Sequence, residues 1–293
     1  MFIDHHLVIH YTKAMSKMLT FVLGGGGSRG ALQVGALFAL LESGLQPDLF
    51  VGTSIGAVNA TFCALHGFSK NGLEKLATAW REAAKLDLLP TNYFWMTVRA
   101  MLGRSSIDPS HRIRDFFIAN GVTPELSFSE FKQPRVMMVS ADLNTGQPVL
   151  HGDSPDEKVL EALLLSTALP PWSRPVRKQG RYEMDGGVVS NLPIEPALKA
   201  GATEIVALDL TDTRDSPILG DGVAGFLNKL SMAVEKRESI LELELAEARG
   251  IPTLYIELLG KFPVPLWDFH HTEELISEGY EIARQKMAAL HPQ

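Results

Sequence analysis

LTFVLGGGGSRG, at residues 19–30, joins a short, mainly apolar run to four consecutive glycines. Residues 19–23 predict a buried strand, and the leucines within residues 32–41 recur at helical spacing after the glycines. Gly44 is a typical residue to end such a helix. The stretch therefore predicts a strand, a glycine turn and a helix, which is the unit from which parallel sheets are built.

The rest of the chain continues this alternation of strands and helices. Residues 49–51 lead into a second glycine-bounded turn, and residues 55–66 then show helical spacing that stops at Gly67. Residues 69–120 are predicted to be mostly helical, with breaks near two prolines. Further strands are predicted at 135–141, at 147–151 as the return arm of a hairpin, on both sides of Gly180, at 203–210 and at 254–258, and further helices at 156–169, 223–249 and 272–290.

This element order predicts a single three-layer α/β domain with a mainly parallel sheet and helices on both faces. No internal repeat, low-complexity linker or shift in composition divides the chain, so one domain is expected over residues 18–293. Residues 1–17 have no clean hydrophobic period and are expected to form a disordered leader. Because Met15 and Met18 stand just before the first strand, part of this leader is hypothesised to reflect an upstream start.

Composition and charge exclude several classes of partner. The 293 residues are 45% hydrophobic, which is enough for a buried core, and their net charge of −7 offers no general attraction for nucleic acid. The single Cys63 cannot form an internal disulfide, and no signal-like start or apolar run of about 18 residues is present. A cytoplasmic setting is expected, with peripheral membrane contact left open and the oligomeric state not indicated.

GTSIG at residues 52–56 has the pattern G-x-S-x-G between a predicted strand and a predicted helix. Small neighbours allow a sharp turn that projects the hydroxyl of Ser54 clear of the backbone, as a nucleophile requires. The start of the following helix would favour negative charge at a reacting carbonyl. The alternative is a serine that only caps the helix, and the motif alone does not decide between the two.

The glycines at 24–27 also have two interpretations. Successive glycines leave backbone N–H groups unshielded, so that they can converge on an oxyanion or a phosphate. The alternative is a tight turn that permits close helix packing, although four glycines are a large entropic cost for a turn alone.

Residues 25–30 satisfy G-x-G-x-x-G after a strand, which is the dinucleotide-binding fingerprint. Glu42 or Asp48 would then be the ribose contact, and the chain would be an oxidoreductase using Gly25, Gly27 and Gly30. This interpretation explains neither GTSIG nor the later Asp-Gly-Gly. A Walker-type phosphate loop is excluded, because no Gly-Lys-Ser/Thr follows the glycines.

Asp185, in the sequence DGG at 185–187, ends a predicted strand. Alone it is a common turn signal. Together with Ser54 it gains chemical meaning, because a desolvated carboxylate within hydrogen-bond reach can activate a serine without an imidazole. A Ser-His-Asp triad is the alternative, with His151, His270 or His271 as the base. Cys63 is expected to be core packing, and no spacing of metal ligands is found.

Five stretches of the sequence resemble the patatin-like phospholipase family. GGGGSRG, GTSIGA and DGGVVSNLPI occur in the family's order, and the match extends over about residues 19–210. SADLNTG and STALPPWSRPV resemble further family segments at 140–146 and 166–176. Trp172 departs from the usual pattern, which puts the shape of the acyl pocket in doubt.

The resemblance implies a Ser-Asp dyad without metal, cofactor or histidine base. By position, Ser54 is the nucleophile and Asp185 the general base. The loop Gly25, Gly26 and Gly27 is implied as the oxyanion and substrate-binding element, with the donors on Gly26 and Gly27, and Arg29 would stabilise the loop or the developing charge. The implied activity is a serine acyl hydrolase acting on a phospholipid, lysophospholipid or neutral lipid ester.

Two points stay open at the level of sequence. The apolar and aromatic residues at 93–102 and 262–269 are either ordinary core or a lid or rim that contacts lipid. Besides the oxidoreductase, the remaining alternative is a non-catalytic lipid-binding or regulatory protein that keeps the pocket.

Overall fold

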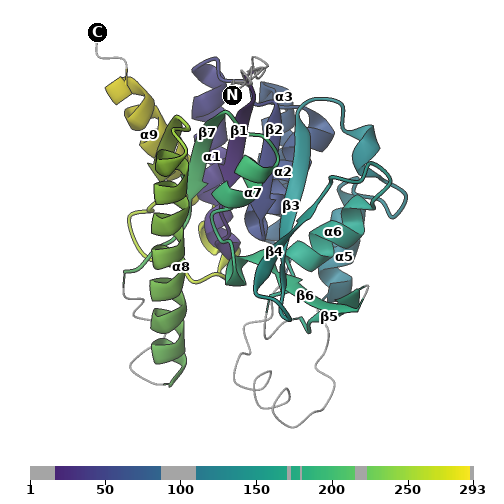
Figure 1. The fold of residues 1–293 in the computed structure, drawn as a ribbon. Coiled ribbons are helices and arrows are strands. Elements are labelled where there is room, and N and C mark those ends of the chain that lie inside the picture. Colours follow the sequence, from purple (N-terminus) through teal and green to yellow (C-terminus); the bar gives the residue numbers. More distant parts are fainter. Residues whose placement is uncertain (1–16, 87–109, 170–172, 179, 215–222, 291–293) are drawn as a thin grey trace, which may run out of the picture.

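The computed structural model describes residues 17–86, 110–169, 173–178, 180–214 and 223–290. Figure 1 shows a central sheet with helices packed on both sides. The sheet has eight strands in the order β5-β6-β3-β2-β1-β7-β8, with β4 beside β3. The strands are β1 (Leu19–Leu23), β2 (Leu49–Thr53), β3 (Arg135–Asp142), β4 (Gln147–His151), β5 (Val176–Lys178), β6 (Arg181–Asp185), β7 (Glu204–Asp209) and β8 (Thr253–Glu257).

Most neighbouring strands run in parallel. β1 pairs in parallel with β2 and β7, β2 with β3, and β7 with β8. The antiparallel part is confined to one side, where β3 pairs with β4 and β6, and β5 with β6. The sheet is therefore mainly parallel, as the alternation of strands and helices predicts, with an antiparallel margin formed by short hairpins.

A hydrophobic cluster lies on each face of the sheet. Alternate side chains such as Phe21 and Phe50 belong to the larger cluster, whereas Val22 and Val51 belong to the smaller one. The larger face packs on α1 (Gly30–Glu42), α2 (Ile55–His66), α3 (Lys70–Ala83), α5 (Ser110–Ala119), α6 (Val159–Ser166) and α9 (Thr272–Leu290). The other is covered by α7 (Ile194–Lys199) and α8 (Val223–Ala248), which completes the predicted three layers.

The length of β3 brings distant segments together. β2 ends where Thr53 lies opposite Val139 on β3, and the next β3 residue, Ser140, lies opposite Asp185 at the end of β6. Since β4 occupies the other edge of β3 at the same residues, β6 continues along the edge that β2 leaves free. The residue after β2 and the last residue of β6 are thereby placed next to each other.

The predicted elements are found at or near their predicted positions. The strand at 19–23 is confirmed, and the hairpin formed by 135–141 and 147–151 is found as β3 and β4. The helix predicted at 156–169 is shorter, Val159–Ser166, because Lys158 still has extended backbone angles. Predictions for residues 1–16, for 93–102 and for Trp172 lie outside the described residues.

Helices α1 and α9 approach each other at two glycines. A Cβ atom on Gly35 would lie 1.8 Å from the carbonyl oxygen of Ile276, and one on Gly279 would lie 1.9 Å from that of Leu32. Both contacts are with backbone, which cannot rotate away. The close approach of the last helix to the first one after the glycine turn therefore depends on the absence of side chains at these positions.

We predict that Gly35→Ala destabilises the protein by about 1–3 kcal/mol through overpacking, although alanine is the better helix former. The control is Ser277→Ala on the exposed side of α9, which should change the free energy of unfolding by less than about 0.5 kcal/mol. Urea denaturation measures both variants. An unchanged or raised midpoint for Gly35→Ala would contradict this contact between α1 and α9.

Candidate active site

Ser54 occupies a sharp turn between β2 and α2. Its backbone angles are φ 53° and ψ −123°, and it is the one residue other than glycine with positive φ among those described. The turn requires its glycines, because a Cβ on Gly52 would lie 2.5 Å from the amide nitrogen of Ala57 and one on Gly56 would lie 2.0 Å from the oxygen of Leu23. The strained turn projects the hydroxyl away from the backbone.

The hydroxyl of Ser54 donates a hydrogen bond to the carboxylate of Asp185. The distance from Oγ to Oδ2 is 2.6 Å. The other carboxylate oxygen, Oδ1, accepts from the backbone N–H of Gly187 at 2.9 Å, which fixes the orientation of the carboxylate. The structure thus brings together two of the residues singled out in the sequence, although 131 positions separate them.

Asp185 is only 1% exposed, and this burial changes its affinity for a proton. Desolvation raises its pKa to about 7, against the opposing hydrogen bonds from Ser54 and Gly187 and with a smaller contribution from the charge of Glu235. A carboxylate that takes up protons near neutral pH is a much better base than an exposed aspartate. The geometry and the pKa are both suited to removing the proton of Ser54.

Ser166 fixes the backbone of the same turn. The N–H of Ser54 donates to Ser166 Oγ at 3.0 Å, and the Ser166 hydroxyl donates to the carbonyl of Val139 at 2.7 Å. This residue ties the turn to β3, so its role is positioning. In the sequence Ser166 falls within a segment that resembles the family, but no pattern there predicted a function for it.

The glycine loop after β1 leaves two donors available beside Ser54. The N–H groups of Gly24 and Gly25 donate to the carbonyls of Leu208 and Asn191, each at 3.0 Å. Within the described chain, the N–H groups of Gly26 and Gly27 have no protein acceptor. Both glycines line a cavity with Ser54.

Gly25 lies directly against the reactive turn. A Cβ at this position would lie 3.3 Å from the Cβ of Ser54 and 2.4 Å from Oδ1 of Asn191. Its own N–H group is already used, as described above. Gly25 therefore contributes close packing against Ser54 and leaves the available donors to the two glycines that follow.

A chain of buried polar side chains supports the loop from beneath. Trp80 Nε1 donates to Asn59 at 2.8 Å, Asn59 donates to Gln33 at 3.0 Å, and Gln33 donates to the carbonyl of Gly24 at 2.9 Å. None of these three residues was predicted from the sequence. The sequence did contain a signal for such a network, an amide residue inside an otherwise apolar helix, because a buried amide needs hydrogen-bond partners.

Arg29 is buried behind the same loop, with 4% of its surface exposed. Its Nε donates to the carbonyl of Gly26 at 3.3 Å. Burial lowers the pKa of Arg29, while the carboxylates of Glu235 and Asp212 act against that shift. The sequence left two roles open for Arg29, stabilising the loop or stabilising the developing charge, and its position fits the first.

The glycines of the possible dinucleotide fingerprint have protein neighbours instead. A Cβ on Gly27 would lie 2.3 Å from the carbonyl oxygen of Leu266, and one on Gly30 would lie 2.5 Å from Ile55. The two acids proposed for the ribose are also committed, since Asp48 accepts from the N–H of Leu19 and Glu42 from the hydroxyl of Tyr280. Each glycine thus has a packing reason that needs no nucleotide.

His151 was a candidate base and lies in a different network. Its Nδ1 is 2.7 Å from Glu157, and its Nε2 is 2.8 Å from the hydroxyl of Ser140 and 3.3 Å from Glu183. Burial acts to lower the pKa of His151, but the hydrogen bonds to both glutamates outweigh it and raise the pKa. The imidazole is therefore committed to these groups and not to Ser54.

His270, His271 and Cys63 do not line either cavity beside Ser54. The ring nitrogens of His271 lie 3.8 Å from Asp268 and 3.5 Å from Glu274, and the backbone N–H of His270 donates to Asp268. Burial raises the pKa of the Cys63 thiol, as expected for core packing. Among the described residues, no group of three or more His, Cys, Asp or Glu is arranged to hold a metal ion.

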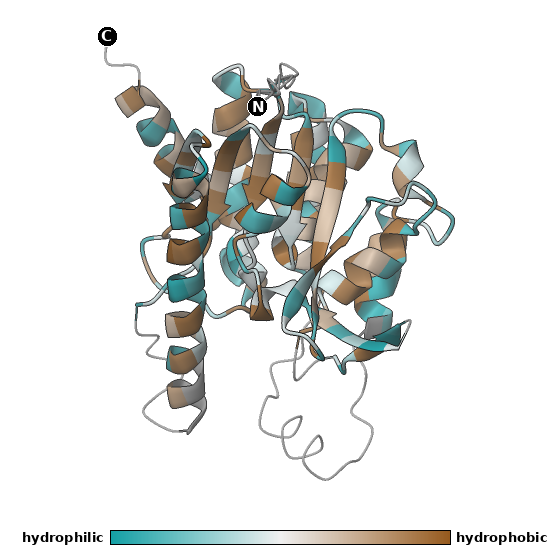
Figure 2. Ribbon diagram, viewed as in Figure 1, coloured by the Kyte–Doolittle hydropathy of each residue, from teal (hydrophilic) through white to brown (hydrophobic). Residues whose placement is uncertain are grey.

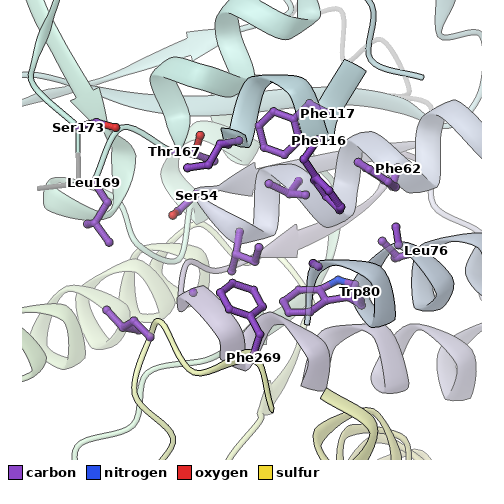
Figure 3. A pocket seen from close by; sticks show the side chains of 17 residues that line it. Ser54, Phe62, Leu76, Trp80, Phe116, Phe117, Thr167, Leu169, Ser173 and Phe269 are labelled. Atoms are coloured by element: carbon purple, nitrogen blue, oxygen red, sulfur yellow. The ribbon is translucent and has the colours of Figure 1, made fainter. Parts of the chain in front are cut away.

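Ser54 lines an apolar cavity. Figure 3 shows Ser54 between Leu169 and Ser173 on one side and the aromatic side chains of Trp80, Phe116, Phe117 and Phe269 on the other. Further lining residues include Val58, Phe62, Leu76 and Ile113. Apart from two small hydroxyl residues, Thr167 and Ser173, the wall offers almost no polar group. It is suited to a hydrocarbon chain.

A second cavity lies on the α8 side of Ser54. It is lined by Gly26, Asp185 and Asn191 from the sheet side and by Leu230, Ser231 and Glu235 from α8. Leu169 and Leu266 line both cavities and stand between them. Ser54 is thus accessible from two differently lined spaces.

The segment at 262–269 contributes to these walls. Leu266 and Phe269 line the apolar cavity, and Val264 is buried. The hydroxyl of Ser28 donates to the carbonyl of Pro265 at 2.8 Å, and the N–H of Ser28 donates to that of Leu266 at 2.8 Å. This segment is therefore buried core at Val264 and Pro265 and cavity wall at Leu266 and Phe269, while Phe262 is 36% exposed.

Comparison with known proteins identifies relatives of the chain. A family model described as patatin-like phospholipase matches residues 21–198. Patatin-like phospholipase domain-containing protein 7 of Mus musculus is 30% identical over 228 residues, which are 72% of this chain and 15% of that protein. Lysophospholipase NTE1 of Scheffersomyces stipitis is 27% identical over 216 residues, 70% of this chain and 12% of that protein. The chain thus matches only a small part of these relatives.

A solved structure shares the fold. Human GIVD cytosolic phospholipase A2, in complex with methyl gamma-linolenyl fluorophosphonate, aligns with a TM-score of 0.52 and 13% sequence identity. The alignment covers 98% of this chain and 59% of that chain. At this identity, the similarity supports the α/β architecture alone.

Proposed function

The chain belongs to the patatin-like phospholipase family, and from that premise we propose that it is a serine acyl hydrolase that cleaves carboxylic esters of lipids. The observation that carries this proposal is the hydrogen bond of 2.6 Å from Ser54 Oγ to Asp185 Oδ2. It is supported by the apolar cavity that Ser54 also lines. The names of the two relatives agree with a lipid ester as substrate.

In the proposed mechanism, Asp185 takes the proton of Ser54 while Oγ attacks the ester carbonyl. The carbonyl oxygen becomes an oxyanion, which the free N–H groups of Gly26 and Gly27 stabilise. Collapse of this intermediate breaks the ester bond, and the departing alcohol takes the proton from Asp185. The product on the protein is an acyl ester of Ser54.

The second half of the cycle repeats these roles with water. Asp185 removes a proton from water, whose oxygen attacks the acyl ester, and the same N–H groups stabilise the new oxyanion. Collapse returns the proton to Ser54 and releases the fatty acid. We place the acyl chain in the cavity between Trp80 and Phe117, because burying its methylenes there is favourable by about 0.8 kcal/mol each.

An exposed apolar row on α8 supports contact with a lipid surface. Figure 2 shows apolar bands recurring along α8, and Phe226, Leu230 and Val234 follow one another at a spacing of four. Their exposed fractions are 67%, 52% and 55%. Leu230 and Val234 also line the cavity beside Ser54, so this apolar row is continuous with the site. We propose that it docks on the membrane that holds the substrate.

None of the helices in the described ranges is long and apolar enough to cross a bilayer.

We predict that Ser54→Ala and Asp185→Asn each lower kcat for a short-chain p-nitrophenyl ester by at least about 10³-fold, because the first removes the nucleophile and the second its general base. The control is Asp153→Asn, an exposed aspartate, which should retain full activity. A fluorophosphonate probe should label the wild type and not Ser54→Ala. Full hydrolysis by Ser54→Ala, with its purity confirmed by mass spectrometry, would overturn the assignment.

We predict that kcat/KM follows the ionisation of Asp185, whose pKa is raised to about 7 by burial. The base acts in its deprotonated form, so activity should fall as the pH drops below about 7, tenfold per unit at the lower end, and level off above it. A pH profile with a pH-insensitive ester measures this. A flat rate between about pH 5 and 8 would mean that the base has an ordinary carboxyl pKa.

We predict that the double substitution Phe226→Ser and Leu230→Ser weakens co-sedimentation with phosphatidylcholine vesicles by about tenfold or more, because it removes two exposed apolar side chains. The single variant Phe226→Ser, which leaves the cavity lining unchanged, should retain hydrolysis of a soluble short-chain ester. The control is Leu290→Ser at the far end of α9, where leucine is exposed to a similar degree, 51%. Equal vesicle binding by wild type and double variant would reject the docking surface.

A further inference from the structure

Two cavities meet at Ser54, and the proposed reaction needs both. An ester carbonyl carbon carries an acyl chain and an alkoxy group, which diverge from the same atom. When Ser54 attacks that carbon, the two substituents must leave the site in different directions. If the acyl chain fills the apolar cavity, the alcohol portion is directed past Leu169 and Leu266 toward α8.

Two polar side chains of α8 line the α8-side cavity, beside the apolar Leu230 and Val234 of the same helix. Glu235 lines it together with Ser231, whose hydroxyl donates to Oε1 of Glu235 at 3.0 Å. Asn191 and Asp185 face the same space from the other side. Hydrogen-bond acceptors therefore lie around the position that the alcohol would take.

Glu235 differs from the acids that follow it on α8. Glu242 accepts from the hydroxyl of Ser190 at 2.9 Å and from the N–H of Glu195 at 2.6 Å, at the start of α7. Glu238 accepts from the N–H of Asn191. These two acids are used to hold the segment after Asp185. Glu235 has a hydroxyl of its own helix as partner and faces the cavity.

The lining of this cavity is acidic. It includes the carboxyl groups of Asp185 and Glu235, and none of the described lining residues is lysine, arginine or histidine. Burial raises the pKa of both groups, so the full negative charge is present above neutral pH. Arg29 does not line the cavity: it lies behind the glycine loop, where its Nε donates to the carbonyl of Gly26, and its charge acts on Glu235 first and then on Asp212 and Asp209. A phosphate in this cavity would meet two carboxylates at the wall, whereas the charge of Arg29 is already opposed by these three acids.

We propose that the α8-side cavity binds the alcohol portion of the ester, and that Glu235 selects alcohols bearing hydroxyl or ammonium groups over alcohols bearing a phosphate. This inference rests on the proposed hydrolase function and adds the class of leaving group. A hydroxyl or ammonium group can donate to the free lone pairs of Glu235. A single charge in contact with a partly buried carboxylate changes affinity by about 10-fold to 100-fold.

Three soluble octanoyl esters test this proposal: monooctanoylglycerol, octanoylcholine and octanoyl-glycerol-3-phosphate. The wild type should hydrolyse the first two with kcat/KM at least about tenfold above that of the phosphate ester. Assays at a pH about 1.5 units above the pKa of Asp185, which is about 7, keep the base ionised in every variant. Loss of the Glu235 charge then acts on selectivity and not on the base.

Glu235→Gln keeps the shape of the side chain and removes its charge. It should lower the ratio of choline ester to phosphate ester by about tenfold, and fluorophosphonate labelling checks that Ser54 is still reactive in the variant. The matched control is Glu244→Gln on the exposed side of α8, which should leave the ratio unchanged. In the reverse direction, Ser231→Lys places a cation in the cavity and should raise the relative rate for the phosphate ester.

The outcomes distinguish a failure of the hydrolase proposal from a failure of the role of Glu235. If the wild type hydrolyses none of the three esters and is not labelled, the hydrolase proposal itself fails. If it hydrolyses all three equally well, or if a folded Glu235→Gln variant leaves the ratio unchanged, the hydrolase stands and the role of Glu235 is overturned. If Glu235→Gln does not fold, a folded Ser231→Lys variant still tests that role, and unchanged ratios in it overturn the proposal.

Discussion

The whole site depends on β3 being longer than β2. Thr53, the last residue of β2, pairs with Val139, and β3 continues beyond that pair. β6 can therefore pair with the edge of β3 that β2 leaves free, and Asp185 lies opposite the next β3 residue, Ser140. Two side chains separated by 131 positions in the chain then meet at 2.6 Å. A shift of β6 by one residue would turn Asp185 to the other face of the sheet, since side chains alternate along a strand. The register of three residue pairs is thus a condition for any chemistry at Ser54.

This arrangement is unfavourable locally and is held by its surroundings. Ser54 has a backbone conformation that costs about 1–3 kcal/mol, and Asp185 is desolvated to the point that its pKa reaches about 7. Ser166 ties the turn to β3, and Gly187 orients the carboxylate. The amides of Asn59 and Gln33 hold the glycine loop at the opposite side. These surrounding contacts therefore keep the strained Ser54 and the desolvated Asp185 in a reactive geometry.

Local patterns in the sequence were sufficient for the elements but not for their contacts. Residues 19–30 and 52–56 combine apolar runs with glycines, so the strand, turn and helix at each were predictable from short-range rules. Short-range rules could not predict that Ser54 meets Asp185, because strand register is set by pairing between distant segments. That contact was expected from the family resemblance alone. The path from Trp80 through Asn59 to Gln33 was not predictable, since each member becomes meaningful only when three helices pack together.

Helix α8 shows why a pattern along one element can be hard to interpret. Its sequence predicts a charged helix, yet its side chains meet three environments: the core at Ala246, the start of α7 at Glu242, and the cavity at Glu235. A fourth set, Phe226 and Leu230, is exposed. No single hydrophobic face results, because the helix leaves the body of the sheet along its length (Figure 1). The same geometry places an acidic wall and an apolar edge beside one serine, so that a lipid tail and its polar alcohol would meet different surfaces on leaving the reacting carbon.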